Sequence, residues 1–467
     1  MENSKEKKNG SISTKSFITA IIVIFGLMVA TYILTLFVSG GVYERIIDQN
    51  GNVVINPDSF TAVEGGIPFW KWLLSPFLVL GEEGSFTIIA IIVFLLVIGG
   101  IFTCLDRSGL MKYMLDKIVH KFGKSRYKLM AIIILFFMVM GTMVGSYEEC
   151  VPLVPIVVAL AVKLGWNKIT GVVMSILAVG CGFAAGVCNP FTVGVAQELA
   201  GLPMFSGVWL RLVSFVLIYG LLLSFTLIYA KKIEQPIDTV KTDADFVATK
   251  KQDTALLLFV VIIGVGIALV LSSAFITALQ DYSMIIVAVM FLVAGVTACF
   301  TYGMNGKEFF KCFGDGVVGI LPAVLMILMA SSIRYTLEQA KVLDTVLYGA
   351  VSLADGLPKW VVILFVYLLV LVMNFFIASG SAKAFMLIPI IVPLAQVFNL
   401  SPQLCVLAFA FGDGFSNVLY PTNPVLLISL GVADVSYGKW LKLTWKFQIL
   451  NLLLTCGILL LGFAVGY

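Results

Sequence analysis

Charge is what this sequence has least of. Of its 467 residues, 12% are Asp, Glu, Lys or Arg and 60% are hydrophobic, and the mean hydropathy is +1.06. A soluble domain averages about 25% charged residues. The scarcity of charge excludes a soluble protein with a single anchor and predicts a polytopic membrane protein.

The residues that most catalytic and metal sites need are also scarce. The one histidine, His120, lies in a Lys-rich connector, and the eight cysteines form no C-x-x-C pair that would indicate a disulfide framework or a zinc site. "HKFGKS" (120–125) ends like a phosphate-binding loop, but Ile118 stands where its first glycine is required. The net charge of +4 is not clustered for nucleic acid. We expect no enzyme activity, no cofactor apart from an optional Na⁺, and no nucleic-acid partner.

Long apolar runs are what the sequence does have. About 20 apolar residues span the hydrocarbon core as a helix. Full spans are predicted near 16–39, 84–104, 208–230, 254–273, 283–303, 313–333 and 443–466. Two further blocks, 128–202 and 359–432, are too long for one span and are broken by Gly, Pro, Asn and charge. They are expected to hold the functional part of the protein.

The distribution of charge predicts the orientation. Loops 105–128 and 231–252 are rich in Lys and Arg, which places them in the cytoplasm, and the acidic segment 40–83 falls outside. The first apolar run follows "MENSKEKKNGSISTK", and it is too long for a signal peptide and lacks a cleavage site. The N-terminus is therefore expected in the cytoplasm.

The two long blocks resemble each other. With Pro155 placed on Pro389, an offset of 234, "PIVVALA" (155–161) faces "PIIVPLA" (389–395) with five of seven positions identical. The same offset places Asn189 on Asn423 and Gly180 on Gly414. The blocks enter the membrane from opposite sides, and inverted repeats of this kind are typical of secondary transporters.

Each block is predicted to form a re-entrant helical hairpin followed by an interrupted helix. The first hairpin has arms 128–145 and 151–164 around a tip at 145–150, and the second has arms 360–378 and 384–397 around a tip at 379–383. The interruptions are expected at 181–190 and 412–424, where Gly and Pro loosen the backbone. Broken backbone at that depth is tolerated where protein buries it or where it lines a wet cavity.

The predicted fold is therefore an all-α polytopic membrane protein with two inverted repeats. Its parts are a cytoplasmic tail (1–15), scaffold helices (16–127), the first transport half (128–207), scaffold and linking helices (208–358), the second transport half (359–432) and a C-terminal membrane helix (433–467).

Four ionisable residues lie at the predicted breaks, namely Glu148, Glu149, Lys383 and Asp413. Each would cost about 2.5–3.5 kcal/mol at the bilayer centre, so they must be paired, solvated or protonated. One interpretation is a structural pair between Lys383 and a carboxylate. Three acids against one base still leave surplus negative charge, which suits a cationic ligand, with Lys383 available for a ligand carboxylate. A dibasic amino acid carries both groups.

Polar residues flank the same breaks. Interrupted helices expose carbonyls at one stub and N–H groups at the other, and these can hold Na⁺ or a ligand carboxylate. Candidates for Na⁺ are Asn189, Thr192, Thr422 and Asn423, although each Asn can also simply cap its second half-helix. Further substrate candidates are Ser146, Tyr147, Asn374, Ser379, Ser381, Ser416 and Asn417.

Three segments carry a family resemblance. "GSYEECVPLVPIVVALAVKLGW", "GFAAGVCNPFTVGVAQELAG" and "FGDGFSNVLYPTNP" resemble the YfcC-type basic amino acid antiporter family, which is related to the anaerobic C4-dicarboxylate carrier C group in the ion-transporter superfamily. The resemblance covers nearly the whole chain. It implies a bacterial inner-membrane homodimer with a scaffold domain and a transport domain that moves like an elevator.

The leading hypothesis is exchange of arginine for ornithine, with the tip carboxylates holding the basic group. A rival is a Na⁺- or H⁺-coupled symporter of carboxylates, other amino acids or short peptides, with Na⁺ at Asn189 and Asn423 and Lys383 as main substrate contact. A second rival is a membrane scaffold or receptor that does not transport. The expected partners are a small amino acid and the lipid bilayer.

Overall fold

The computed structural model describes residues 14–47, 53–56, 59–82, 85–145, 147–203, 205–236, 249–273, 283–353 and 357–467, and this part of the chain is nearly all helical. Within it, eight helical segments are long and apolar enough to cross a membrane: Leu110–Met143, Lys168–Ala185, Val208–Ile233, Lys250–Leu269, Ile285–Tyr302, Gly306–Gln339, Lys359–Phe376 and Tyr437–Val465. The protein is a multi-pass membrane protein, as its composition predicts.

The N-terminal part combines two helices with a small extramembrane region. Helix α1 (Thr14–Phe37) leads into two antiparallel ribbons, β1 (Gly40–Val42) with β4 (Thr61–Val63) and β2 (Arg45–Ile47) with β3 (Val53–Ile55). Short helices α2 (Phe69–Leu73) and α3 (Ser75–Leu78) precede α4 (Ser85–Arg107). Arg45 forms an ion pair of 2.7 Å with Asp344, which fastens the ribbons to α16 (Val342–Ser352).

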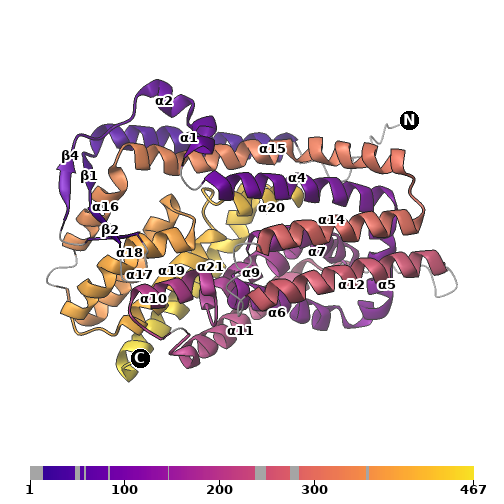
Figure 1. The fold of residues 1–467 in the computed structure, drawn as a ribbon. Helices are drawn as coiled ribbons and strands as arrows, with labels where there is room; N and C mark the ends of the chain where they lie inside the picture. Colours follow the sequence, from indigo (N-terminus) through magenta and orange to yellow (C-terminus); the bar gives the residue numbers. More distant parts are fainter. Residues whose placement is uncertain are drawn as a thin grey trace.

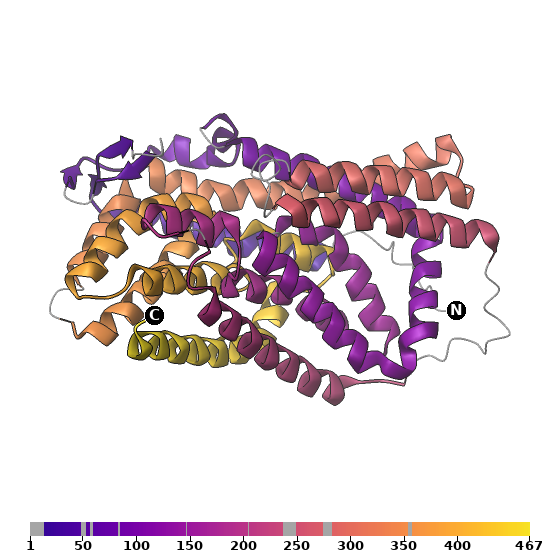
Figure 2. The same cartoon turned by 60° about the horizontal axis from the view of Figure 1, so that its bottom comes forward.

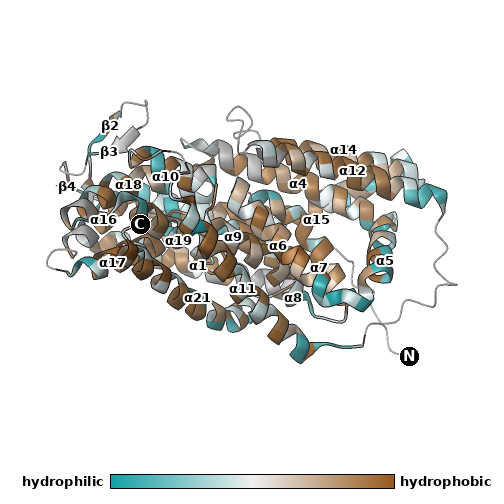
Figure 3. Cartoon of the chain, turned by 90° about the horizontal axis from the view of Figure 1, so that it is seen from below, coloured by the Kyte–Doolittle hydropathy of each residue, from teal (hydrophilic) through white to brown (hydrophobic). Residues whose placement is uncertain are grey.

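The predicted connector 105–128 contains a helix of its own. Helix α5 (Leu110–Phe122) has one apolar face and one basic face. Figure 3 shows that it runs across the ends of the long helices. Hydrophilic residues gather on α5 and on the adjoining end of α12 (Lys250–Ser273), whereas the middle of the bundle is hydrophobic (Figure 3). An amphipathic helix at the boundary of the apolar region buries its stripe and keeps its lysines in water.

The first long block folds as separate helical pieces. These are α6 (Arg126–Val144), a 3₁₀ turn (Glu148–Leu153), α7 (Val154–Lys163), α8 (Lys168–Val172), a π-helical turn (Val173–Leu177), α9 (Ala178–Ala185), a second π-helical turn (Pro190–Gly194) and α10 (Val195–Leu199). Helices α6 and α7 match the predicted arms. The interruption is shorter than expected, since α9 continues to Ala185 and ends at Gly186 in the left-handed conformation (φ 52°).

The middle of the chain supplies long single helices. These are α11 (Val208–Ile233), α12 (Lys250–Ser273), α14 (Ser283–Tyr302) and α15 (Gly306–Gln339). Each contains one predicted span. Neighbouring pairs α12–α14, α14–α4 and α4–α15 pack against each other, and Figures 1 and 2 show this layer along one side of the molecule.

The second long block also folds as separate helices. Helix α17 (Lys359–Phe376) is followed by α18 (Gly380–Val397), α19 (Pro402–Asn417), α20 (Pro424–Val432) and the terminal α21 (Tyr437–Val465). Two expected boundaries are wrong. The tip ends earlier than 383, because α18 begins at Gly380, and α19 runs without interruption to Asn417, so the break covers 418–423 and Asp413 lies within a helix.

The glycines beside Asp413 are required for packing and do not end the helix. A Cβ on Gly412 would lie 2.6 Å from Cβ of Val370, and one on Gly414 would lie 2.3 Å from Cα of Ala184. Glycine permits such close approach of two backbones because it has no side chain.

Helices α9 and α19 form the centre of the molecule. Every residue of α9 is buried, as is α19 from Gln403 onward; α6 packs on α9, α17 packs on α19, and α9 and α19 pack on each other (Figure 1). At their crossing, a Cβ on Gly180 would lie 2.2 Å from Cγ1 of Val418, as one on Gly414 would approach Ala184. Gly180 and Gly414 are 234 positions apart (414 − 180), and so are Ala184 and Val418 (418 − 184). The same offset therefore exchanges the two contacts.

Candidate functional site

The tips and the breaks of the two long blocks meet near the middle of the molecule. The hydroxyl of Tyr147 donates to the main-chain carbonyl of Asn417 at 3.2 Å, which joins the first tip to the end of α19. A Cβ on Gly380, at the start of α18, would lie 2.6 Å from Cγ2 of Thr192 and 2.7 Å from Oδ2 of Asp413. Each tip thus touches the interrupted helix of the other block.

The first tip begins at a glycine that ends helix α6. Helix α6 ends at Gly145 in the left-handed conformation (φ 73°), and a Cβ there would lie 2.5 Å from Oδ1 of Asn189, which leaves no room for a side chain. The tip therefore also contacts its own break. Tyr147 is buried, and the carboxylates of Glu148 and Glu149 are partly buried. Ser146 lies outside the described residues.

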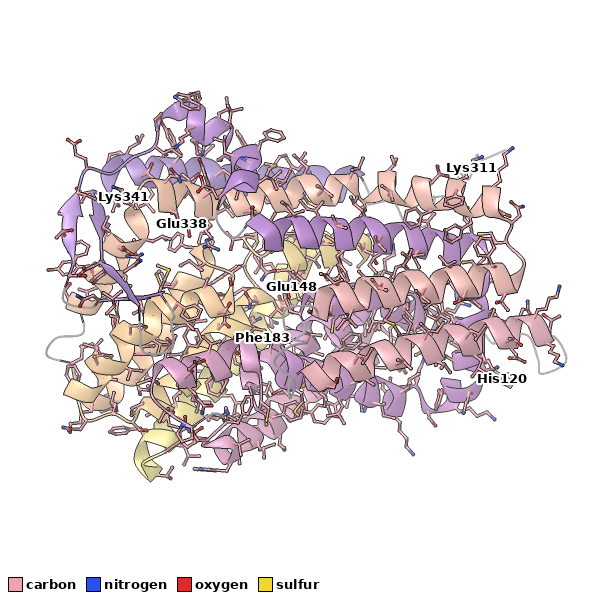
Figure 4. All side chains as sticks on the ribbon, in the orientation of Figure 1. His120, Glu148, Phe183, Lys311, Glu338 and Lys341 are labelled. Atoms are coloured by element: carbon pink, nitrogen blue, oxygen red, sulfur yellow. The ribbon has the colours of Figure 1, made fainter. Side chains whose placement is uncertain are left out.

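Negative charge gathers at this tip. Glu148 and Glu149 are consecutive residues at the start of the 3₁₀ turn Glu148–Leu153. Among the described residues, no lysine or arginine lies within ion-pair distance of Glu148. Figure 4 shows Glu148 midway between the end that carries His120 and Lys311 and the end that carries Lys341. Glu148 therefore lies away from both ends of the molecule.

The second tip carries a compensated charge. Nζ of Lys383 lies 2.7 Å from Oδ1 of Asp413, and both side chains are 0% exposed. The ammonium also donates to the carbonyl of Ile377 at 3.0 Å and to Oδ1 of Asn374. Three oxygens thus surround a group with three donors. The structural pairing of Lys383 with a carboxylate is present, and Asp413 is its partner.

Amides extend this cluster to the second break. Nδ2 of Asn374 lies 2.7 Å from Oγ of Ser416 and 3.0 Å from Oδ1 of Asn417, which also accepts from Nδ2 of Asn423 at 3.0 Å. Oδ1 of Asn423 accepts from the main-chain N–H of Val425 at 2.9 Å and so caps α20. The capping interpretation of Asn423 is confirmed.

The two predicted Na⁺ threonines share one property. Thr192 is 0% exposed and Thr422 is 7% exposed, and neither hydroxyl has a hydrogen-bond partner within the described ranges. A buried hydroxyl without a partner is costly. Oxygen donors of this kind suit a hard cation. Two other candidates are less enclosed, since Ser379 is exposed and Ser381 is partly buried. Asn189 is 0% exposed, and its main-chain carbonyl accepts from the N–H of Gly194 at 3.0 Å.

One buried charge was not singled out from the sequence. Arg211 on α11 is 0% exposed, and it donates to the carbonyls of Val187 (3.3 Å) and Ser206 (2.8 Å) and to the hydroxyl of Tyr467 (3.4 Å). It joins the first break to the end of α21. An arginine inside the predicted span 208–230 was a usable signal, because charges within spans are functional or structural sites by default.

Comparison with known proteins adds an independent line of evidence. The C4-dicarboxylate anaerobic carrier family matches residues 17–464. The chain is 32% identical over 379 residues, 76% of this chain and 74% of the other, to YfcC of Escherichia coli (strain K12), whose name describes it provisionally as a basic amino acid antiporter. It is 24% identical over 398 residues, 81% of this chain and 76% of the other, to a Haemophilus influenzae protein whose name assigns no function.

A solved structure is also similar. The Alcanivorax borkumensis YdaH transporter is 19% identical, with a TM-score of 0.46 over 96% of this chain and 99% of that one.

Proposed function

Because this chain belongs to the C4-dicarboxylate anaerobic carrier family, and is therefore a membrane transporter and not an enzyme, we propose that it exchanges basic amino acids, arginine against ornithine. We place it in the bacterial inner membrane with its N-terminus in the cytoplasm, because the basic loops 105–128 and 231–252 favour that orientation.

The surplus of acid at the first tip is the observation that carries the proposal. Lys383 matches the charge of Asp413, whereas no lysine or arginine in the described part of the chain lies within ion-pair distance of Glu148. A guanidinium or ammonium group of the substrate supplies the missing positive charge, and hydrogen bonds between charged groups contribute about 1.5–3 kcal/mol each. The name of the E. coli relative points to the same substrate class.

The substrate carboxylate needs a different partner. The Lys383 ammonium donates to Asn374 and Ile377 and forms an ion pair with Asp413, so we assign the carboxylate to the main-chain N–H groups at the start of α18, beside Ser379 and Ser381. The first N–H groups of a helix have no partner within the helix and carry partial positive charge. In this proposal Lys383 positions α18, and the main-chain N–H groups of α18 bind the substrate carboxylate.

Exchange follows from the same electrostatics. An empty site would carry the Glu148 carboxylate through the apolar interior without a counter-charge, and such a charge costs about 2.5–3.5 kcal/mol at mid-depth. A bound cation removes that cost, so the loaded carrier reorients faster than the empty one. We propose an elevator movement of residues 128–207 and 359–432 against scaffold helices 16–127 and 208–358, with 433–467 as the closing membrane helix, in a homodimer. The offset-related glycine contacts of α9 and α19 support an inverted repeat.

Uptake of labelled arginine into proteoliposomes tests the exchange. Vesicles preloaded with ornithine should take up arginine at least tenfold faster than vesicles loaded with choline. Equal rates in the two preparations would contradict exchange. Glutamate-loaded vesicles serve as the control for nonspecific counterflow.

The rival symport of carboxylates or other substrates rests on a different observation, the two buried hydroxyls of Thr192 and Thr422 without hydrogen-bond partners. Under that mechanism a Na⁺ gradient drives uptake into vesicles without any counter-substrate, and Thr192→Val or Thr422→Val abolishes the Na⁺ dependence. If H⁺ and not Na⁺ is the coupling ion, a pH gradient drives uptake in the same assay.

A further inference from the structure

The surroundings of the Lys383 ammonium have the composition of a metal-cation site. Its three oxygen neighbours are a carboxylate (Asp413), a side-chain amide (Asn374) and a main-chain carbonyl (Ile377). Ile377 follows the last residue of α17, where the helix dipole places partial negative charge. Carboxylate, amide and carbonyl oxygens are the ligands that hard cations select.

The site is closed to water and joins three helices. Lys383 and Asp413 are 0% exposed and Asn374 is 2% exposed. Gly380 lies so close to Asp413 that an added Cβ would be 2.7 Å from Oδ2. Asn374 and Ile377 belong to the end of α17, Lys383 to the first turn of α18, and Asp413 to α19. A cation at this position, which in the structure is the Lys383 ammonium, holds the start of α18 against α19.

We propose that the Lys383 ammonium is a built-in replacement for a metal cation at the junction of α17, α18 and α19. It supplies the charge that Asp413 requires, and it makes this half of the site independent of Na⁺. Removal of the lysine side chain uncovers a Na⁺ site made by Asp413, Asn374 and the Ile377 carbonyl. The inference concerns ion dependence and does not rest on the substrate being a basic amino acid.

The test compares two variants of the full-length purified protein. Lys383→Ala removes the charge and opens the space, whereas Lys383→Met removes the charge and keeps the space filled. Thermal midpoints are measured in NaCl, KCl and choline chloride at equal ionic strength. The shift in midpoint between NaCl and choline chloride in the unmodified protein is the baseline, since it includes any Na⁺ bound elsewhere.

Na⁺ should stabilise Lys383→Ala above that baseline by about 1–2 °C when its concentration is tenfold above the dissociation constant, and by more at higher concentrations. Lys383→Met should show only the baseline shift, and Lys383→Ala/Asp413→Asn should lose the excess. An equal shift in Lys383→Ala and the unmodified protein would overturn the proposal. So would an excess that survives Asp413→Asn, or a Lys383→Ala protein that cannot be purified in NaCl although Lys383→Ala/Asp413→Asn can.

Discussion

The two predicted transport halves, 128–207 and 359–432, place opposite charges at positions related by the 234-residue offset. This offset puts Glu149, in the first tip, opposite Lys383, in the first turn of α18 (383 − 149). The Lys383 charge is enclosed and matched by Asp413 within its own half, whereas Glu148, next to Glu149, is partly exposed and has no ion-pair partner in the described structure. The second half thus contains both members of its buried ion pair. Under the proposed function, a cationic substrate neutralises the first half.

Breaking the enclosed pair should have the largest effect. Lys383→Met leaves Asp413 buried without its counter-charge, and loss of one partner of a buried pair costs about 3–5 kcal/mol of folding free energy. The matched control is Lys168→Met, because Lys168 pairs with Asp434 at 2.9 Å with side chains 49% and 27% exposed. An exposed pair contributes about 0–1 kcal/mol.

Denaturation of both variants in the same detergent measures the difference. Similar losses of unfolding free energy in Lys383→Met and Lys168→Met would show that the buried pair does not stabilise the second half. They would contradict the contrast between the two halves.

Removing a tip charge should impair transport and leave stability nearly unchanged. Glu148→Gln keeps the shape of the side chain, and the lost charge-assisted contact should raise the KM for arginine by about 10- to 100-fold. The control is Glu198→Gln, since Glu198 is exposed on α10. Initial rates of counterflow over a range of arginine concentrations give KM. A Glu148→Gln carrier with normal KM would remove the first half from substrate binding.

Alanine substitutions at the close crossing of α9 and α19 should destabilise the protein by different amounts at Gly414 and Gly180. Gly414→Ala would place its Cβ against the backbone of Ala184, and overpacking of this kind costs about 1–3 kcal/mol. Gly180→Ala meets the side chain of Val418, which can adjust, and should cost less. Gly264→Ala on α12 meets nothing within 4 Å and serves as the control. Thermal midpoints that follow any other order would contradict this account of the crossing.

The smallest effect is expected where the halves are joined by one hydrogen bond. Tyr147→Phe removes the donor to the Asn417 carbonyl, and a single hydrogen bond contributes about 0.5–1.5 kcal/mol. The midpoint of unfolding should fall slightly. Rates of arginine exchange are measured beside it, because loosening this link should change the rate and leave KM intact. An unchanged midpoint and rate would mean that the link does not couple the two halves.

Much of the architecture was predictable because its signals are local. Runs of about 20 apolar residues marked the position of each long helix, although α15 (Gly306–Gln339) extends beyond the predicted span 313–333 at both ends, and α6 and α7 match the expected arms. The acids at the first tip could be predicted for the same reason, since charge in an apolar block is conspicuous. Arg211 carried the same signal inside a predicted span, whereas its partners Val187 and Tyr467 became evident only in the structure.

The second interruption shows where local signals fail. "GDG" at 412–414 reads as a helix breaker, yet α19 continues to Asn417 because these glycines admit Val370 and Ala184. Glycine serves both purposes, and only the neighbouring helix decides between them. The apolar, membrane-spanning character of the chain and the position of its acids were determined by the sequence alone, since hydropathy acts residue by residue. The number of long helices was not, because three of the eight long apolar segments, Leu110–Met143, Lys168–Ala185 and Lys359–Phe376, are not among the seven predicted full spans. Which carboxylate pairs with Lys383 was decided by tertiary structure, because residues distant in sequence share one enclosed site only after the helices pack.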